Sequence, residues 1–269
     1  MKLVKRWKLL LVSLCAITIS CYMLPTLSAA SAVPAEMYTQ AEKRIAVVID
    51  DFGNNMKGTE EMLKLPIPLT VAVMPLLPSS RRDAETAHRL GKEVIVHLPM
   101  EPVRGKKSWL GPGAITTDLT NEEIRSRVLA AIDSVPFAVG MNNHMGSKAT
   151  ADPRVMKVVL EVCKDKGLFF LDSRTSFKSV IPQVAEQVGV PVVRNAVFLD
   201  DVYSAAHVSK QISKLKMYLD SHQTCVTIGH VGPPGKITSA LLAQSIPTFK
   251  TTRFVTVSEL LPKPLPQIP

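Results

Sequence analysis

The side chains best suited to chemistry stand directly after short apolar runs of the sequence. They are aspartate, glutamate, asparagine, histidine and arginine, and they follow six such runs. The six groups are Asp50 and Asp51; His97 and Glu101; Asn142, Asn143 and His144; Asp172 and Arg174; Arg194, Asn195, Asp200 and Asp201; and His230. Three of the chain's six histidines belong to this set, while the other three fall in segments predicted to be helical. The pattern therefore predicts a shared site.

Carboxylate and imidazole side chains together suit a divalent cation, with zinc as the first choice and iron, cobalt, nickel and manganese as alternatives. A catalytic zinc takes three protein ligands and leaves one position open for water. Each residue alone also has an ordinary explanation. An aspartate can cap a helix, a histidine can bond a backbone carbonyl, and Arg174 can pair with Asp172 or Asp201. We expect a site because all of these residues would meet on one rim.

The runs that must position these residues are continuous rather than alternating, which is typical of parallel strands buried on both faces. Amphipathic segments separate most of them. Apolar runs occupy 45–49, 69–74, 94–96, 137–141, 168–171, 190–193 with 197–199, 225–228 and 254–257. Helices are predicted at 56–65, 80–91, 121–134, 153–166, 178–188, 205–221 and 236–245. Several carry end signals, such as the capping box that starts at Thr120 and the Asp152-Pro153 pair.

This alternation predicts an α/β fold with parallel strands, in which function collects beyond the carboxyl ends of the strands. A single-domain barrel suits the strand count and the length, and an open doubly wound sheet is the alternative. No change of composition divides the central part, so we predict one domain at 43–260. A short linker at 31–42 precedes it, and a proline-rich tail at 261–269 follows it.

The first 30 residues have the pattern of a secretory signal peptide. Four basic residues are followed by an apolar run over 9–24 and then by small residues near Ala30. The sequence thus predicts a secreted or cell-envelope protein. An uncleaved anchor, or lipidation at Cys21, would instead hold the protein at a membrane surface; the residue at position 18, Thr18, is not the aliphatic one that a lipidation signal prefers.

The net charge of +9 does not indicate nucleic-acid binding. The first 30 residues hold four of the basic residues, so the remainder has 28 basic against 23 acidic residues, scattered rather than gathered in a stripe. This excludes a nucleic-acid groove and fits mild attraction to an anionic envelope. Beyond residue 30 the cysteines are Cys163 and Cys225, without the spacing of a thiolate metal site. They could form one disulfide or stay as two buried thiols.

Five ordered segments resemble the divergent polysaccharide deacetylase family. They read VIDDFG (48–53), HLPMEP (97–102), GMNNHMGS (140–147), FLDSRT (170–175) and IGH (228–230). The resemblance covers about residues 43–260. This family is similar to the polysaccharide deacetylases of the carbohydrate esterase class. The resemblance implies a distorted (β/α) barrel with about seven parallel strands.

The resemblance also implies roles for individual residues. In the relatives the first aspartate of the pair is the base and the second binds the metal, which matches Asp50 and Asp51. His97 matches the first histidine of a two-histidine motif, whereas Glu101 stands where the second is expected. The arginine motif after the fourth strand is missing, and His144 occupies that neighbourhood. His230 matches the histidine that acts as the acid.

From chemistry and position we infer a metal site formed by Asp51, His97 and His144, with Glu101 completing it, supporting it or orienting an imidazole. Arg174 or Arg194 would orient a carboxylate. Asn143 and Asp172 would bind substrate or support the site.

The predicted function is a metal-dependent hydrolase that removes N- or O-acetyl groups from an envelope polysaccharide or peptidoglycan-type glycan. The alternative is a catalytically altered barrel that binds glycans or assists envelope assembly. Hydrolysis of a peptide or phosphoester is a third reading, although no phosphate-binding loop supports it.

Overall fold

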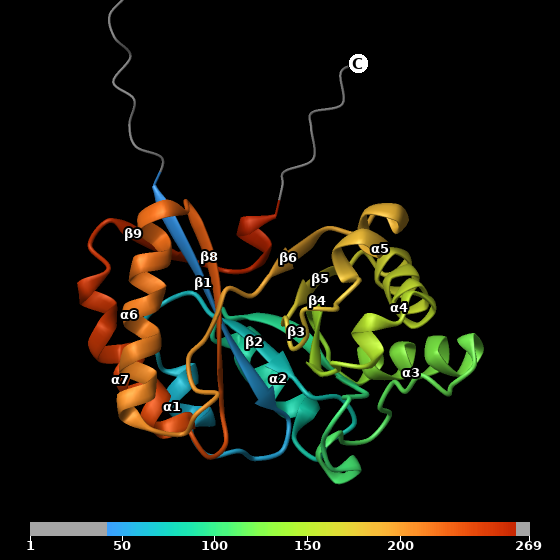
Figure 1. Ribbon diagram of the computed structural model, residues 1–269. Helices are drawn as coiled ribbons and strands as arrows, with labels where there is room; N and C mark the ends of the chain where they lie inside the picture. The colour runs from blue at the N-terminus through green and yellow to red at the C-terminus, as the bar shows by residue number, and fades with distance from the viewer. Residues whose placement is uncertain (1–41, 262–269) are drawn as a thin grey trace, which may run out of the picture. The chain divides into compact units, whose positions relative to one another are not determined.

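The computed structural model describes residues 42–261, which form a parallel sheet with helices packed on its outer surface (Figure 1). The strands are β1 (Lys43–Phe52), β2 (Thr70–Val73), β3 (Glu93–Met100), β4 (Ala138–Met145), β5 (Phe169–Asp172), β6 (Val192–Arg194), β7 (Val197–Phe198), β8 (Thr224–His230) and β9 (Thr252–Val255). The predicted signal peptide at 1–30 and nearly all of the predicted linker and tail lie outside the described residues.

The helices match the predicted segments closely. They are α1 (Thr59–Leu63), α2 (Ser80–Arg89), α3 (Asn121–Ser134), α4 (Pro153–Asp165), α5 (Ile181–Val188), α6 (Ala205–Ser221) and α7 (Gly235–Ser245). The residues predicted to cap the starts of α3 and α4 do so in the structure. The Thr120 hydroxyl accepts from the Glu123 amide while the Glu123 carboxylate accepts from the Thr120 amide, and Asp152 caps α4. Within residues 42–261, no helix combines the length and the apolar character needed to span a bilayer.

The strand order confirms the barrel and excludes the doubly wound alternative. The order is β6-β5-β4-β3-β2-β1-β8-β7, with β9 paired to β1, and every pairing is parallel. A doubly wound sheet would reverse direction beside its first strand. Here the two ends of the order, β6 and β7, are consecutive in the chain. The short stretch 192–198 pairs first with β5 and then with β8, so it completes the curl of a distorted barrel.

One edge of β1 is shared by two partners. Its first half pairs with β9, through Lys43 and Thr252, and its second half pairs with β2, through Val48 and Thr70. With β9 the strand count within residues 42–261 is nine, above the seven or so that the resemblance implies. The sharing leaves the carboxyl half of β1, which ends at the aspartate pair, in the centre of the sheet.

Successive residues of each strand point to two different apolar clusters. In β1, Ile45, Val47 and Ile49 pack with helix residues, whereas Ala46 and Val48 pack in a cluster whose fully buried members are strand residues and Val257. The second cluster therefore fills the inside of the barrel. Both faces of the strand are buried, which explains why the apolar runs are continuous.

The same alternation decides which polar side chains enter the barrel. The inward positions continue from Ala46 and Val48 to Asp50, from Ile95 to His97, and from Val226 and Ile228 to His230. In β4, Met141 packs outward, so Asn142 and His144 point inward. These strands also run further than predicted. β3 and β4 extend to Met100 and Met145, so His97 and His144 lie within strands rather than after them.

Candidate metal centre

Both aspartates face the site because β1 ends in an irregularity. Ile49 pairs with Val71 and Phe52 with Val73, so β1 has one residue more than β2 between these pairs. Asp51 takes up the difference with a left-handed backbone, at φ 71°. Without this bulge, Asp51 would point outward. The aspartates do not cap the next helix, since α1 has Gly58 at its N-cap position.

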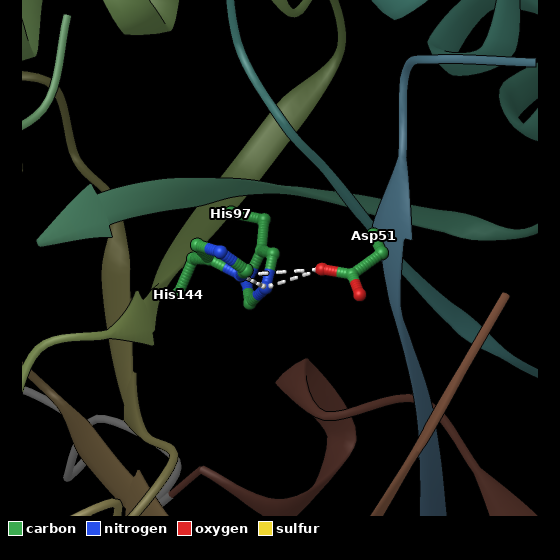
Figure 2. Close-up of side chains that lie close together, drawn as sticks. All are labelled: Asp51, His97 and His144. Atoms are coloured by element: carbon green, nitrogen blue, oxygen red, sulfur yellow. Dashed lines mark hydrogen bonds and ion pairs between the residues drawn. The ribbon is translucent and has the colours of Figure 1, made fainter. Parts of the chain in front are cut away.

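Three potential ligand atoms converge on one point at the floor of a cavity of about 530 Å³. Oδ1 of Asp51, one ring nitrogen of His97 and one of His144 all lie within 4.8 Å of one another. Figure 2 shows the carboxylate of Asp51 facing the two imidazoles. Asp51 Oδ1 is 3.4 Å from His97 Nε2 and 3.2 Å from His144 Nδ1, and these two nitrogens are 3.1 Å apart.

The second nitrogen of each imidazole is held by an acceptor on the chain. Nδ1 of His97 lies 2.7 Å from Oδ1 of Asn142. The orientation of this amide is fixed because its Nδ2 donates to Oδ1 of Asp50, at 3.0 Å. Nε2 of His144 donates to the backbone carbonyl of Trp109, at 3.0 Å. Each ring thus keeps its proton on the far side, and its lone pair faces Asp51.

The donor set fits a divalent cation. Asp51 Oδ1 is buried and has no hydrogen-bond partner among the described residues, although buried polar atoms are normally paired. Burial alone would raise the pKa of Asp51, but the imidazoles of His144 and His97, when protonated, lower it well below its usual value. One carboxylate oxygen and two imidazole lone pairs directed at one point form a ligand set of the catalytic zinc type.

Asp50 lies beside the cluster in a drier environment. It is almost fully buried, and its Oδ2 is 3.5 Å from His97 Nε2. Burial raises the pKa of Asp50, although His97, His230 and Asn142 oppose the shift. Burial would lower the pKa of His97, but the carboxylates of Asp50 and Asp51 raise it instead. The pair of aspartates therefore differs in environment, with one basic carboxylate next to one ligand carboxylate.

His230 lines the same cavity and is oriented by Asp200. Its Nδ1 lies 2.7 Å from Asp200 Oδ1, and its backbone amide donates to Asp200 Oδ2 at 2.9 Å. The Thr238 hydroxyl also donates to Asp200 Oδ2, at 2.7 Å, so this fully buried carboxylate is satisfied on both oxygens. Burial would lower the pKa of His230, but the bond to Asp200 and the charges of Asp51 and Asp50 raise it to about 9.

Glu101, which was expected to complete the ligand set or to support it, lies elsewhere. Its Oε2 accepts from the amide and the hydroxyl of Thr117, and its Oε1 accepts from Lys148 Nζ at 2.8 Å. Burial would raise the pKa of Glu101, but these contacts lower it. The carboxylate thus ties down the segment that follows β3. Asn142, rather than Glu101, takes the role of orienting the imidazole of His97.

The expected carboxylate-binding arginines do not line the cavity. Arg174 donates to the backbone carbonyl of Asn195, and Arg194 lies 3.7 Å from the carboxylate of Asp172. Asp172 itself points outward from β5 and accepts from the Arg174 amide and the Ser179 hydroxyl. These three residues hold the loop after β5 in place.

Asn143 was expected to bind substrate or support the site, and it does line the cavity. Its Oδ1 accepts from the Ser173 amide and its Nδ2 donates to the Met145 carbonyl. Its side-chain amide therefore joins the ends of β4 and β5 and shapes the cavity wall.

Some cavity residues escaped the sequence analysis. Asn142, which lies behind His97, was placed in the predicted site but given no role, although its inward position in β4 was available from the alternation of Met141. Trp109, Phe198 and Tyr203 also line the cavity. They come from a short 3₁₀ helix, a two-residue strand and a loop, where the rule of polar residues after apolar runs gives no signal.

The two remaining cysteines are free and buried, which selects the thiol alternative over the disulfide. Burial raises the pKa of both Cys163 and Cys225 to about 12.

Comparison with known proteins places this site in a family. The divergent polysaccharide deacetylase family matches residues 47–261. An uncharacterized protein of Haemophilus influenzae is 36% identical over 73% of this chain and 69% of its own length. The uncharacterized protein YibQ of Escherichia coli is 35% identical over 71% of this chain. That match spans 59% of YibQ, which is less than two thirds of its length.

Solved structures agree on the fold. An uncharacterized protein of Agrobacterium tumefaciens superposes with a TM-score of 0.76 at 20% identity, over 82% of this chain and 90% of that one. The catalytic domain of a peptidoglycan N-acetylglucosamine deacetylase of Eubacterium rectale gives a TM-score of 0.50 at 16% identity, over 87% and 96% of the two chains. The matched segment holds the bulge of β1, the three converging ligand atoms and His230. This chain belongs to the divergent polysaccharide deacetylase family.

Proposed function

We propose that this protein is a metal-dependent hydrolase that removes N- or O-acetyl groups from an envelope polysaccharide. Membership of the family supports a carbohydrate deacetylase type of chemistry. The observation that carries the proposal is the convergence of Asp51 Oδ1 with the lone-pair nitrogens of His97 and His144. We propose zinc as the cation, because one carboxylate and two imidazoles leave room for a water ligand. A bound cation would polarise the acetyl carbonyl and lower the pKa of a water molecule.

The chain's own groups divide the proton transfers between them. Asp50 is the base, because burial raises its pKa toward the range in which a carboxylate accepts a proton effectively. The Asn142 amide donates to Asp50 Oδ1 and so leaves Oδ2 as the oxygen that takes the proton from water.

His230 is the acid that protonates the leaving amine or alcohol. The bond to Asp200 helps to raise the pKa of His230, to about 9 in the metal-free protein, which favours the protonated imidazole at neutral pH. Asp200 also holds the ring by Nδ1 and leaves Nε2 to donate. The base and the acid thus have separate environments, as a reaction with two proton transfers requires.

We also propose that the protein is exported to the envelope by its first 30 residues, where peptidoglycan-type glycans would be its substrates. The basic, apolar and small-residue order of that segment supports this.

The test is acetate release from peptidoglycan and from N-acetylated chitooligosaccharides by the zinc-loaded protein. We expect release by the wild type and none by Asp51→Ala or Asp50→Asn. Asp220→Asn is the matched control, because Asp220 is exposed and makes only a 3.9 Å pair with Lys43 among the contacts of the described residues. If the wild type bound the metal and released no acetate from either glycan, the hydrolase proposal would be abandoned.

The alternative of a glycan-binding barrel has one observation in its favour. Glu101 stands where the relatives have their second histidine ligand, and its carboxylate is committed to Lys148 and Thr117. Metal analysis of the purified protein separates the two functions, since a protein that binds oligosaccharide but no metal would be the binding barrel.

A further inference from the structure

Two aromatic side chains stand exposed on the walls of the cavity above the metal centre. Trp109 is 58% exposed and Tyr203 is 63% exposed, and both line the cavity whose floor holds Asp51 and the two imidazoles. Large aromatic rings left in water at the mouth of a polar cavity mark a binding surface more often than a packing surface.

The two rings come from opposite sides of the barrel. Trp109 ends the short 3₁₀ helix Lys107–Trp109, which follows β3, and Tyr203 lies between β7 and α6. In the strand order, β2, β1 and β8 separate β3 from β7 in one direction, and β4, β5 and β6 separate them in the other. The metal centre lies between the two walls, because its ligands come from β1, β3 and β4.

The ring of Trp109 is held in place before any ligand arrives. Lys106 Nζ lies 5.6 Å from the ring centroid. A side chain at Gly105 would meet Met145 Cε at 2.8 Å and would come within 4.0 Å of the Trp109 ring, so the glycine lets the loop pack closely there. The carbonyl of Trp109 is bonded to His144. Such preorganisation reduces the entropy that a ligand must remove on binding.

The charges of the cavity restrict the ligand. In the part of the chain that the structure describes, the titratable side chains lining it are four aspartates and three histidines, with no lysine or arginine among them. The aspartates are Asp50, Asp51, Asp200 and Asp201. Lys106 is engaged with the face of Trp109 rather than with the cavity floor. A sugar that carries a carboxylate would therefore find no lysine or arginine in the cavity lining to pair with.

We propose that Trp109 and Tyr203 are stacking platforms for an uncharged N-acetylated sugar chain of at least two rings, which spans the metal centre and is distinguished from acidic glycans. This inference rests on the proposed function and narrows its substrate from peptidoglycan-type glycans in general to stretches of neutral, N-acetylated sugar backbone. Sugar rings have apolar C–H faces and polar edges, so they match a cavity with aromatic walls and a polar floor. The ring next to the cluster would present its acetyl group, while its neighbours stack on the walls.

The experiment measures binding without turnover. Tryptophan occurs twice in the chain, so the full chain with Trp7→Phe has Trp109 as its only tryptophan, and its fluorescence reports directly on the wall. The metal is removed with a chelator, and the protein is titrated with N,N′,N″-triacetylchitotriose, N-acetylglucosamine and trigalacturonic acid. We expect saturable quenching or a spectral shift with the neutral trimer, and Kd values about tenfold weaker for the monomer and the acidic trimer.

Variants identify the platforms. Tyr203→Ala and, by calorimetry, Trp109→Ala should each weaken binding of the neutral trimer about tenfold. Tyr203→Phe should retain the affinity, because the ring rather than the hydroxyl makes the contact. Phe177→Ala is the control, since Phe177 is fully exposed on the loop after β5 and does not line the cavity. Circular dichroism confirms that each variant is folded.

The inference is overturned if the wild type fails to bind the neutral trimer or binds the acidic trimer equally well. It is also overturned if the Trp109 and Tyr203 variants keep the wild-type Kd, or if Phe177→Ala weakens binding to the same extent. These readouts do not need acetate release. Selective binding without release contradicts only the hydrolase proposal, and release with unchanged Kd values in the variants contradicts only this one.

Discussion

Nδ1 of His144 and Nε2 of His97 lie 3.1 Å apart, and each ring uses its other nitrogen to donate to a fixed acceptor. Two neutral imidazoles in these tautomers direct lone pairs at each other and at the carboxylate of Asp51. A cation or a proton between them relieves the repulsion. The folded chain is therefore built around a positive charge at this point.

Divalent metal should stabilise the folded protein. At a free zinc concentration about 100 times the Kd, binding adds roughly 2.7 kcal/mol to the free energy of unfolding, so thermal unfolding should shift upward by several degrees and return on chelation. His144→Ala should lose this shift. His222→Ala should keep it, because His222 is exposed and stacks on Tyr218. An equal shift in wild type and His144→Ala would place the metal elsewhere.

Two substitutions of Asn142 should affect metal affinity and catalytic rate differently. Asn142→Ala removes the acceptor for His97 and the donor to Asp50, and loss of such a supporting contact typically weakens metal binding about 10–100-fold. Asn142→Asp keeps the acceptor and places a second negative charge beside Asp50. We expect it to bind metal more tightly than Asn142→Ala and yet to release little acetate.

Competition titrations with a zinc chelator give the metal affinities, and acetate assays give the rates. Equal affinities in Asn142→Ala and the wild type would contradict the role given to the amide. Full activity in Asn142→Asp would contradict the assignment of Asp50 as the base.

His230 should titrate far above an ordinary histidine. Its pKa in the folded, metal-free protein is raised to about 9, against about 6.5 in an unfolded chain. Its protonation therefore contributes stability that is fully present below pH 6.5 and is lost as the pH rises through 9. Asp200→Asn removes the main stabilising partner, so the pKa should fall toward or below the ordinary value.

Proton NMR titration of the histidine Cε1–H resonances, after removal of metal with a chelator, measures the pKa of His230 in the wild type and in Asp200→Asn. A wild-type His230 that titrates near pH 6.5, or one that is unchanged in Asp200→Asn, would contradict the pairing.

Cys163 and Cys225 should resist alkylation while the protein is folded. Both are buried, and burial raises the pKa of both thiols to about 12, so little thiolate forms at pH 8. Iodoacetamide followed by peptide mass spectrometry should find both unmodified, and both should react in guanidinium chloride. Fast labelling of the folded protein, or a peptide pair joined by a disulfide, would contradict the buried thiols.

The apolar runs were sufficient to predict a parallel α/β fold, and the barrel among its alternatives was implied by the family resemblance. The runs between Ile45 and Val257 all correspond to strands, and the combined run 190–199 corresponds to both β6 and β7, because parallel strands buried on both faces leave a continuous apolar pattern. The end signals Thr120 and Asp152 mark helices where they were expected. The runs stop at the first polar residue, and for this reason β3 and β4 were predicted too short.

The site was predictable only in part. Strand alternation places His97 and His144 on one face. The inward orientation of Asp51, however, depends on a bulge and a positive φ, which cannot be predicted from an aspartate at that position. Glu101 occupies a ligand position of the motif, yet its carboxylate accepts hydrogen bonds from Lys148 and Thr117. These two residues are distant from each other in the sequence. Contacts of this kind arise from loop packing, which a single sequence does not encode locally.

The bond from His144 to the carbonyl of Trp109 has a consequence for how metal and glycan share the site. The barrel fixes the lone pair of His97 through Asn142, but the lone pair of His144 is fixed by a loop outside the sheet. A contact that restrains this loop therefore also restrains the imidazole of His144, which is the metal ligand. A glycan stacked on Trp109 would thus tighten metal binding, and by thermodynamic linkage the metal would tighten glycan binding by the same factor. The loop would then couple the two ligands, so that neither affinity would be a constant of the protein alone.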